Sequence, residues 1–254
     1  MELNNIDYNC FIGKWPFSWA RQTDLDKLGI IHEAHGIDSG YVSCLDSVLY
    51  NDPMEGNLEL AKFIKNTLYE MVPCMNPLLP NPERDFRISY ESFDYRAVRI
   101  MPTVHGYDLD DPNLLEFAEI AASRQKGLIV HTTFGDPRLD YLLLQKPINL
   151  MKLPKLLEKT VDTPLLLCNI RLNEISELND VLETYENIYI DMSELKHSMF
   201  SIEHLKEKGL LGRLVFGSFY PMFDFSGAYV HFRGADENTR DRILGNNIFQ
   251  RGIK

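Results

Sequence analysis

Two side chains that can move protons stand near the ends of apolar, β-rich runs. His131 lies in LIVHTT, and Asp191 lies in IYIDMS. Imidazole titrates near neutral pH, so His131 could act as a general acid or base, and Asp191 could orient it or serve as a base. The alternatives are a histidine hydrogen-bonded to neighbouring strands and an acid that caps a turn or pairs with an arginine.

Two arginines could bring positive charge to the same region. Strand alternation in AVRIMP turns Arg99 inward, and in LLLCNIR it turns Asn169 and Arg171 inward. A guanidinium fork suits a carboxylate or phosphate, so we expect a small anionic molecule, partly aromatic or apolar, as the ligand. The competing interpretation pairs each arginine with an acid such as Asp7 or Asp191.

Two loops extend the set of candidate ligand-binding residues. Ser218 and Tyr220 lie in GSFYP, where their hydroxyl groups could bind the ligand, and His105 in MPTVHGYD could line a lid. The alternatives are a turn shaped by Tyr220 and Pro221, and a solvated loop histidine. The serine-hydrolase pattern GxSxG and the phosphate-loop pattern GxxxxGK[ST] do not occur in the chain.

Short β-rich runs alternate strictly with amphipathic segments, which predicts parallel strands joined by right-handed crossovers. Eight such units in 254 residues match a closed barrel, so the predicted fold class is α/β, a single (β/α)8 TIM barrel forming one domain over residues 1–254. An open doubly wound sheet is the alternative. In a barrel, functional groups gather at the carboxyl ends of the strands. The expected strands are residues 6–11, 39–45, 69–75, 95–101, 127–133, 164–170, 187–193 and 213–219, and the expected helices are 24–35, 57–66, 82–90, 112–125, 151–160, 174–185, 201–208 and 236–245.

The four cysteines lie inside apolar runs and have no CxxC spacing. This pattern favours reduced core thiols over disulfides or a metal cluster. Strand alternation places Cys10 opposite Asn9 and Phe11, and it places Cys168 on the face that packs against helices.

Composition narrows the classes of partner. The net charge of −11 argues against a nucleic-acid backbone, which needs clustered Lys and Arg. No apolar run reaches bilayer length, and the start MELNNIDYN lacks the basic residues of a signal peptide. We therefore expect a cytoplasmic protein that binds neither nucleic acid nor membrane; a homo-oligomer is compatible with a barrel, although no stretch specifies one.

Several stretches in fixed order carry a resemblance over nearly the whole chain. They are IDYNCFIG at 6–13, YRAVRIMP with the helix leading to LIVHTT, TPLLLCNIR, ENIYIDMSEL, RLVFGSFYP and DRILGNNIFQ. In this order they resemble the amidohydrolase-related (amidohydrolase 2) family of metal-dependent TIM-barrel hydrolases and decarboxylases. IDYNCFIG is similar to the family's opening Asp-x-His-x-His-x-Gly strand, and RLVFGSFYP is similar to its terminal FGSDxP strand.

The resemblance implies a divergent member that lacks most metal ligands. Position by position, the two first-strand histidines become Asn9 and Phe11, the sixth-strand histidine becomes Asn169, and the eighth-strand aspartate becomes Phe219. The fifth-strand histidine is kept as His131. A catalytic zinc needs about three protein ligands, so we expect no metal and no other cofactor in this site.

Two functions follow as expectations. The first is a hydrolase or lyase acting on a small organic acid without a metal. The second is a catalytically inactive relative that binds a small anionic ligand or supports an active paralogue. A third alternative is a divalent metal held through His131, with His105 and Asp191 as unusual further ligands.

Overall fold

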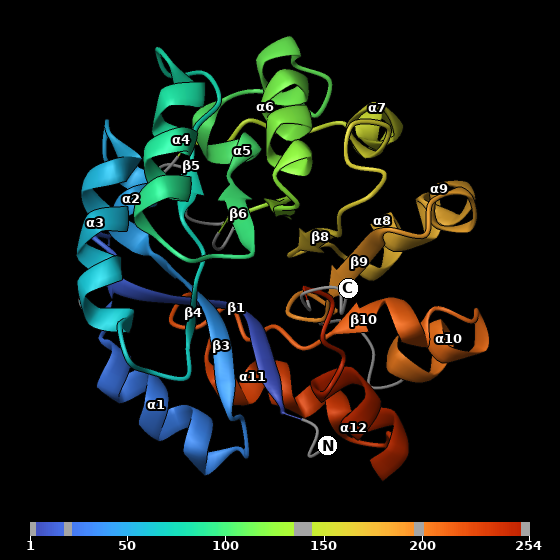
Figure 1. Cartoon of the computed structure of the whole chain (residues 1–254). Helices are drawn as coiled ribbons and strands as arrows, with labels where there is room; N and C mark the ends of the chain where they lie inside the picture. The colour runs from blue at the N-terminus through green and yellow to red at the C-terminus, as the bar shows by residue number, and fades with distance from the viewer. Residues whose placement is uncertain (1–3, 18–21, 135–143, 196–200, 250–254) are drawn as a thin grey trace.

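The computed structural model describes residues 4–17, 22–134, 144–195 and 201–249. Parallel strands form a central barrel, and helices surround it (Figure 1). The strands are β1 (Ile6–Lys14), β2 (Gln22–Thr23), β3 (Ser39–Cys44), β4 (Glu70–Met71), β5 (Cys74–Met75), β6 (Ala97–Ile100), β7 (Gly127–His131), β8 (Leu165–Cys168), β9 (Ile188–Asp191) and β10 (Leu214–Val215).

The helices follow the strands in the order expected for a (β/α)8 barrel. The expected helix at 82–90 is present as α4, and short helices that the sequence pattern did not predict follow β3, β6 and β10. The helices are α1 (Leu25–Ala34), α2 (Leu45–Leu49), α3 (Pro53–Ile64), α4 (Pro82–Ser92), α5 (Pro102–His105), α6 (Pro112–Ser123), α7 (Leu153–Leu157), α8 (Leu172–Glu177), α9 (Asn179–Thr184), α10 (Ser201–Glu207), α11 (Phe225–Tyr229) and α12 (Glu237–Leu244).

Backbone pairing closes the barrel and confirms the predicted fold class. The pairs β1–β3, β3–β4, β5–β6 and onward to β9–β10 are all parallel. β4 and β5 lie in one expected strand, interrupted at Pro73, which has no N–H to donate. β10 returns to β1, because Tyr8 N donates to Phe216 O at 2.9 Å and Phe11 N donates to Tyr220 O at 2.9 Å.

Side chains of the barrel divide between two apolar layers. One layer lies between strands and helices and includes Leu165 and Leu167 of β8. The other lies inside the barrel and includes Leu166, Cys168 and Ile129. The prediction that Cys168 faces the helices is therefore wrong. The prediction extended the in–out alternation of side chains to Asn169. β8 has ended there, and Asn169 has a left-handed backbone with a φ of 60°, so the alternation no longer holds.

An irregularity in β1 changes which residues share a face. Asp7 pairs with Gly40 and Cys10 pairs with Val42, so two residues of β1 lie opposite the single Tyr41 of β3. This is a β-bulge, in which an extra residue shifts the alternation of the strand. Cys10 consequently packs in an outer cluster with residues of α1 and α3, as predicted from its position opposite Asn9 and Phe11.

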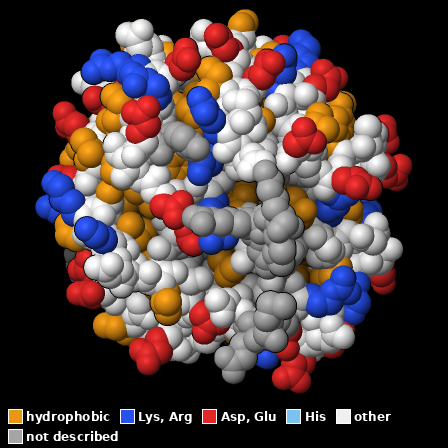
Figure 2. Space-filling view, viewed as in Figure 1, with side chains coloured by type: hydrophobic (Ala, Val, Ile, Leu, Met, Phe, Trp, Pro, Cys, Tyr) orange, Lys and Arg blue, Asp and Glu red, His pale blue; other side chains and the backbone are white. Residues whose placement is uncertain are grey.

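The surface carries mixed charge. Lys and Arg side chains are interspersed with Asp and Glu around the edge of the face in Figure 2. Among the described residues, none of the helices is both long and apolar enough to cross a bilayer.

Two helical glycines make a matched test of the packing. A Cβ on Gly56 of α3 would lie 2.4 Å from Ser47 Oγ and 2.6 Å from Ser47 N, whereas a Cβ on Gly29 of α1 would find its nearest neighbour at 3.8 Å. We expect Gly56→Ala to lower the free energy of unfolding by about 1–3 kcal/mol through overpacking. Gly29→Ala should raise it by about 0.5–1 kcal/mol, because Ala is the better helix former. Urea unfolding measures both, and equal effects would contradict the packing of α2 against α3.

Candidate functional site

Polar side chains from five strands meet inside the barrel toward the carboxyl ends of the strands. Asn9 comes from β1, Arg99 from β6, His131 from β7, Asn169 from the end of β8 and Asp191 from β9, and all five are completely buried. Parallel strands bring these ends together, as expected for the functional face of a TIM barrel.

Arg99 lies at the centre of this group. Its Nη1 donates to Asn9 Oδ1 at 3.0 Å and lies 3.2 Å from His131 Nε2. Its guanidinium carbon lies 4.3 Å from the centre of the Phe11 ring, a cation–π contact. Arg99 therefore contacts three of the positions that the resemblance assigns to metal ligands.

Backbone carbonyls fix the other side of the guanidinium. Arg99 Nη2 donates to Tyr8 O and to Tyr41 O, each at 3.2 Å. Among the described residues, Arg99 makes no ion pair with a carboxylate within 4.0 Å. The expected pairing of this arginine with Asp7 or Asp191 is thus not found. Burial lowers the pKa of Arg99, but an arginine side chain stays charged in a protein.

His131 is neutral in this setting. Burial, and then the charge of Arg99, hold its pKa well below the ordinary value, and a hydrogen bond with Asn169 opposes them. A neutral imidazole can accept a hydrogen bond from Arg99 at Nε2 when Nδ1 carries the ring hydrogen. The rings of Phe11, Phe134 and Phe219 surround it, at centre-to-centre distances of 5.7, 5.8 and 5.7 Å.

Asp191 is the titratable acid of the group. Its Oδ2 accepts from Asn9 Nδ2 at 2.7 Å, and its Oδ1 accepts from Asn169 N at 2.9 Å. Burial raises the pKa of Asp191 to about 7, against the hydrogen bonds from Ser193, Asn9 and Asn169 that lower it. Asp191 is thus hydrogen-bonded to the two asparagines, and we find no hydrogen bond between it and His131 among the described side chains.

Two residues of the site have left-handed backbones. Asn169 has φ 60° and Phe219 has φ 53°. Asn adopts the left-handed region readily, whereas for a bulky Phe this conformation costs about 1 kcal/mol or more. Phe219 N donates to Asn9 O, which holds the Phe219 backbone against β1. Gly217 is required nearby, because a Cβ there would lie 2.4 Å from Asp191 Oδ2.

The remaining predicted residues lie around this centre or away from it. Ser218 is buried and its N donates to Asp7 Oδ1 at 3.0 Å. Tyr220 is partly exposed and packs against the outer apolar clusters. His105 lies in α5, where its Nε2 is 3.1 Å from Val48 O and burial lowers its pKa, so it is not a solvated loop histidine. Arg171 is partly exposed and immediately precedes α8.

Sequence reasoning did not select Phe134 as a site residue. Its ring lies 5.7 Å from Phe11 and 5.4 Å from Phe219, and it is almost completely buried. The available signal was an aromatic residue three positions after His131, just beyond the carboxyl end of a predicted strand.

The residues inside the barrel do not fit a divalent metal. Of the five positions that the resemblance assigns to ligands, Phe11 and Phe219 offer no donor atom and asparagine is a poor zinc ligand. The Nε2 of His131 faces the guanidinium of Arg99 at 3.2 Å. A cation placed among these side chains would also meet the charge of Arg99.

No family model matches this chain, and no curated relative matches it. Solved structures do match. An uncharacterized TIM-barrel protein from Bordetella bronchiseptica is 16% identical with a TM-score of 0.73, and 96% of each chain is covered. The 5-carboxyvanillate decarboxylase from Sphingomonas paucimobilis is 12% identical with a TM-score of 0.72, over 98% of this chain and 99% of that one. An amidohydrolase from Burkholderia multivorans with bound zinc is 11% identical with a TM-score of 0.63, over 95% and 96% of the two chains.

At these identities the likeness establishes the fold. The chain is a (β/α)8 barrel over nearly its whole length, as the sequence predicts. The similar structures include a decarboxylase and an amidohydrolase. The resemblance found in the sequence is therefore confirmed at the level of the fold.

Asp191 provides a test by pH. Its folded pKa of about 7 lies above the ordinary carboxyl value, so the native state holds this proton between about pH 4 and 7 while the unfolded chain releases it. Asp191 makes its full contribution to the free energy of unfolding below about pH 4. This contribution is lost as the pH rises to about 7. Relative to Asp191→Asn, wild type should lose roughly 4 kcal/mol of unfolding free energy across this window.

Urea unfolding of both proteins at several pH values measures that difference. Both proteins contain His131, whose low folded pKa makes the free energy of unfolding decrease as the pH falls. Comparing the two proteins therefore cancels the contribution of His131. Parallel curves for the two proteins would mean that Asp191 titrates at its ordinary pKa.

Proposed function

We propose that this protein is a divergent member of the amidohydrolase-related family that acts as a hydrolase or lyase on a small organic acid without a metal. Its support is a barrel shared with an amidohydrolase and a decarboxylase, together with a buried polar centre at the functional end of that barrel. The expected cytoplasmic location and the small anionic partner remain part of this proposal.

The position of Arg99 carries the proposal. Its guanidinium contacts Asn9, Phe11 and His131, so a fixed positive charge occupies the surroundings in which the resemblance expects a metal. A preorganised charge in a water-excluded site stabilises negative charge that develops during a reaction. Arginine also binds carboxylates through its fork, and Arg99 Nε has no hydrogen-bond partner among the described residues.

Asp191 supplies the proton chemistry in this proposal. A carboxyl group with a pKa of about 7 can both give and take a proton near neutral pH, which general acid–base catalysis requires. His131 is neutral and positions the guanidinium. Arg171 lies beyond the end of β8 and would contact the carboxylate of an incoming ligand, and Ser218 and His105 would shape the surroundings.

A binding protein without catalysis is the second candidate. One observation favours this candidate. The buried polar side chains hydrogen-bond to one another, and three phenylalanine rings pack around His131. In this case the same arginine would bind an anion without turnover.

The test is turnover of a panel of small carboxylates, starting with 5-carboxyvanillate, in excess chelator. We expect turnover to persist, because no step uses a metal. Arg99→Met should lower kcat by about 10²–10³, the usual effect of removing one preorganised charge or donor. Arg96→Met is the matched control: Arg96 precedes the same strand at its amino end and pairs with Glu70 at 3.3 Å, so kcat should not change.

The outcomes separate the candidates. Turnover that the chelator abolishes would contradict metal independence. An unaffected kcat in Arg99→Met would contradict the role of the guanidinium. If no carboxylate turns over, but one raises the melting temperature of wild type and not of Arg99→Met, the binding protein replaces the enzyme.

A further inference from the structure

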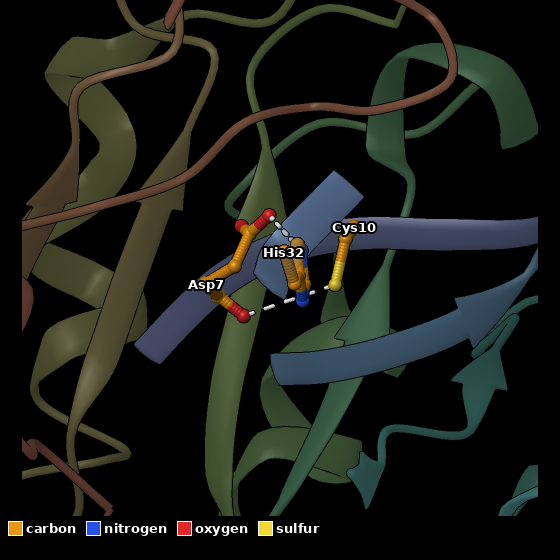
Figure 3. Close-up of side chains that lie close together, drawn as sticks. All are labelled: Asp7, Cys10 and His32. Carbon is orange, nitrogen blue, oxygen red and sulfur yellow. Dashed lines mark hydrogen bonds and ion pairs between the residues drawn. The ribbon is translucent and has the colours of Figure 1, made fainter. Parts of the chain in front are cut away.

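Three potential metal ligands lie together outside the barrel interior. Asp7 and Cys10 belong to β1, and His32 belongs to α1 (Figure 3). All three are buried, and their ligand atoms lie within 4.8 Å of one another. Cys10 packs with Leu28 of α1, so the group lies between strand and helix.

Local structure explains why these residues meet. The bulge in β1 lets Asp7 and Cys10 both reach the helix side. Gly40, the β3 partner of Asp7, leaves the space that the group occupies: a Cβ there would lie 2.9 Å from Cys10 Sγ and 3.2 Å from His32 Cε1. Any larger residue at position 40 would press on both side chains.

The carboxylate is oriented by hydrogen bonds from outside the group. Asp7 Oδ1 accepts from Asn9 N and from Ser218 N, each at 3.0 Å. These bonds leave Oδ2 facing His32 Nε2 at 3.2 Å. Two ligands of a tetrahedral zinc stand roughly 3.3 Å apart, given metal–ligand bonds of about 2.0–2.1 Å. Asp7 and His32 are therefore already spaced as a pair of zinc ligands.

The imidazole and the thiol complete the arrangement. Tyr69 Oη lies 3.1 Å from His32 Nδ1, which fixes the ring and leaves Nε2 as the ligand atom. Cys10 Sγ has weak contacts with two carbonyls, those of Asp7 at 3.8 Å and Tyr41 at 3.7 Å. A metal-bound thiolate would replace these weak contacts.

We propose that Asp7, Cys10 and His32 bind one transition-metal ion, with zinc the best match. One sulfur, one nitrogen and one oxygen donor suit a borderline-soft ion, and a carbonyl beside Sγ or a water would complete four ligands. Binding releases the thiol proton and replaces the Asp7–His32 hydrogen bond. The imidazole proton moves from Nε2 to Nδ1, where Tyr69 Oη can accept it in a hydrogen bond. Sγ moves toward the other two donors, and the ion joins α1 to β1. This site is separate from the chemistry proposed inside the barrel, where no metal takes part.

The experiment uses the full chain, stripped with chelator and titrated with Co²⁺ and then with Zn²⁺. We expect one Co²⁺ per chain and a near-ultraviolet sulfur-to-cobalt charge-transfer band, which Zn²⁺ displaces. Cys10→Ser should remove the band and weaken binding about a hundredfold or more. Cys44→Ser is the matched control, because Cys44 is a buried thiol of the same outer cluster. It should keep the band.

Two further variants locate the ion. Tyr69→Phe removes one hydroxyl from a partly exposed residue and should weaken zinc binding about 10–100-fold, the usual effect of losing a group that orients a ligand. His131→Gln should bind the metal as wild type does. Absence of binding, a band that survives in Cys10→Ser, or unchanged affinity in Tyr69→Phe would overturn the proposal. Loss of binding in His131→Gln would place the ion inside the barrel. Chelator-sensitive turnover in Cys10→Ser, which lacks the outer site, would independently refute the proposed metal-free function.

Discussion

The structure of the barrel centre depends on one buried cation, the guanidinium of Arg99. Taking a charged group out of water costs several kcal/mol, and no carboxylate among the described residues lies within 4.0 Å of this guanidinium. The compensation comes from the carbonyls of Tyr8 and Tyr41, from Asn9 and from the face of the Phe11 ring. Each of these groups offers an acceptor or a π-face to the cation.

The same cation opposes the binding of a metal ion among these side chains. A divalent ion about 4 Å from a guanidinium meets a repulsion of about 8 kcal/mol at an effective dielectric constant of 20. Burial, and then the charge of Arg99, lower the pKa of His131, whose Nε2 lies 3.2 Å from Arg99 Nη1. In the proposed metal-free function, this permanent protein charge would do the work that a bound ion does in the family that the sequence resembles.

β1 connects the barrel centre to the group on its outer side. One irregular step in this strand directs Asn9 and Phe11 into the barrel and Asp7 and Cys10 toward α1. The backbone N–H of Asn9 also donates to Asp7, so one hydrogen bond links the two groups. An ion that joined α1 to β1 would hold the strand that carries the contacts of Arg99, and would do so without entering the chemistry.

The sequence by itself determined the order of eight strands, and alternation directed Asn9, Arg99 and Asn169 inward, where they meet because parallel strands bring their carboxyl ends together. Arg171, also predicted to face inward, lies partly exposed before α8. The prediction that Cys168 faces the helices was wrong, because side-chain alternation cannot be extended beyond the end of a strand to a residue with a left-handed backbone. Only the tertiary structure decided which groups touch Arg99, how far burial raises the pKa of Asp191, and that His32 reaches Asp7. These properties depend on register, bulges and burial, which arise from contacts between residues distant in the chain.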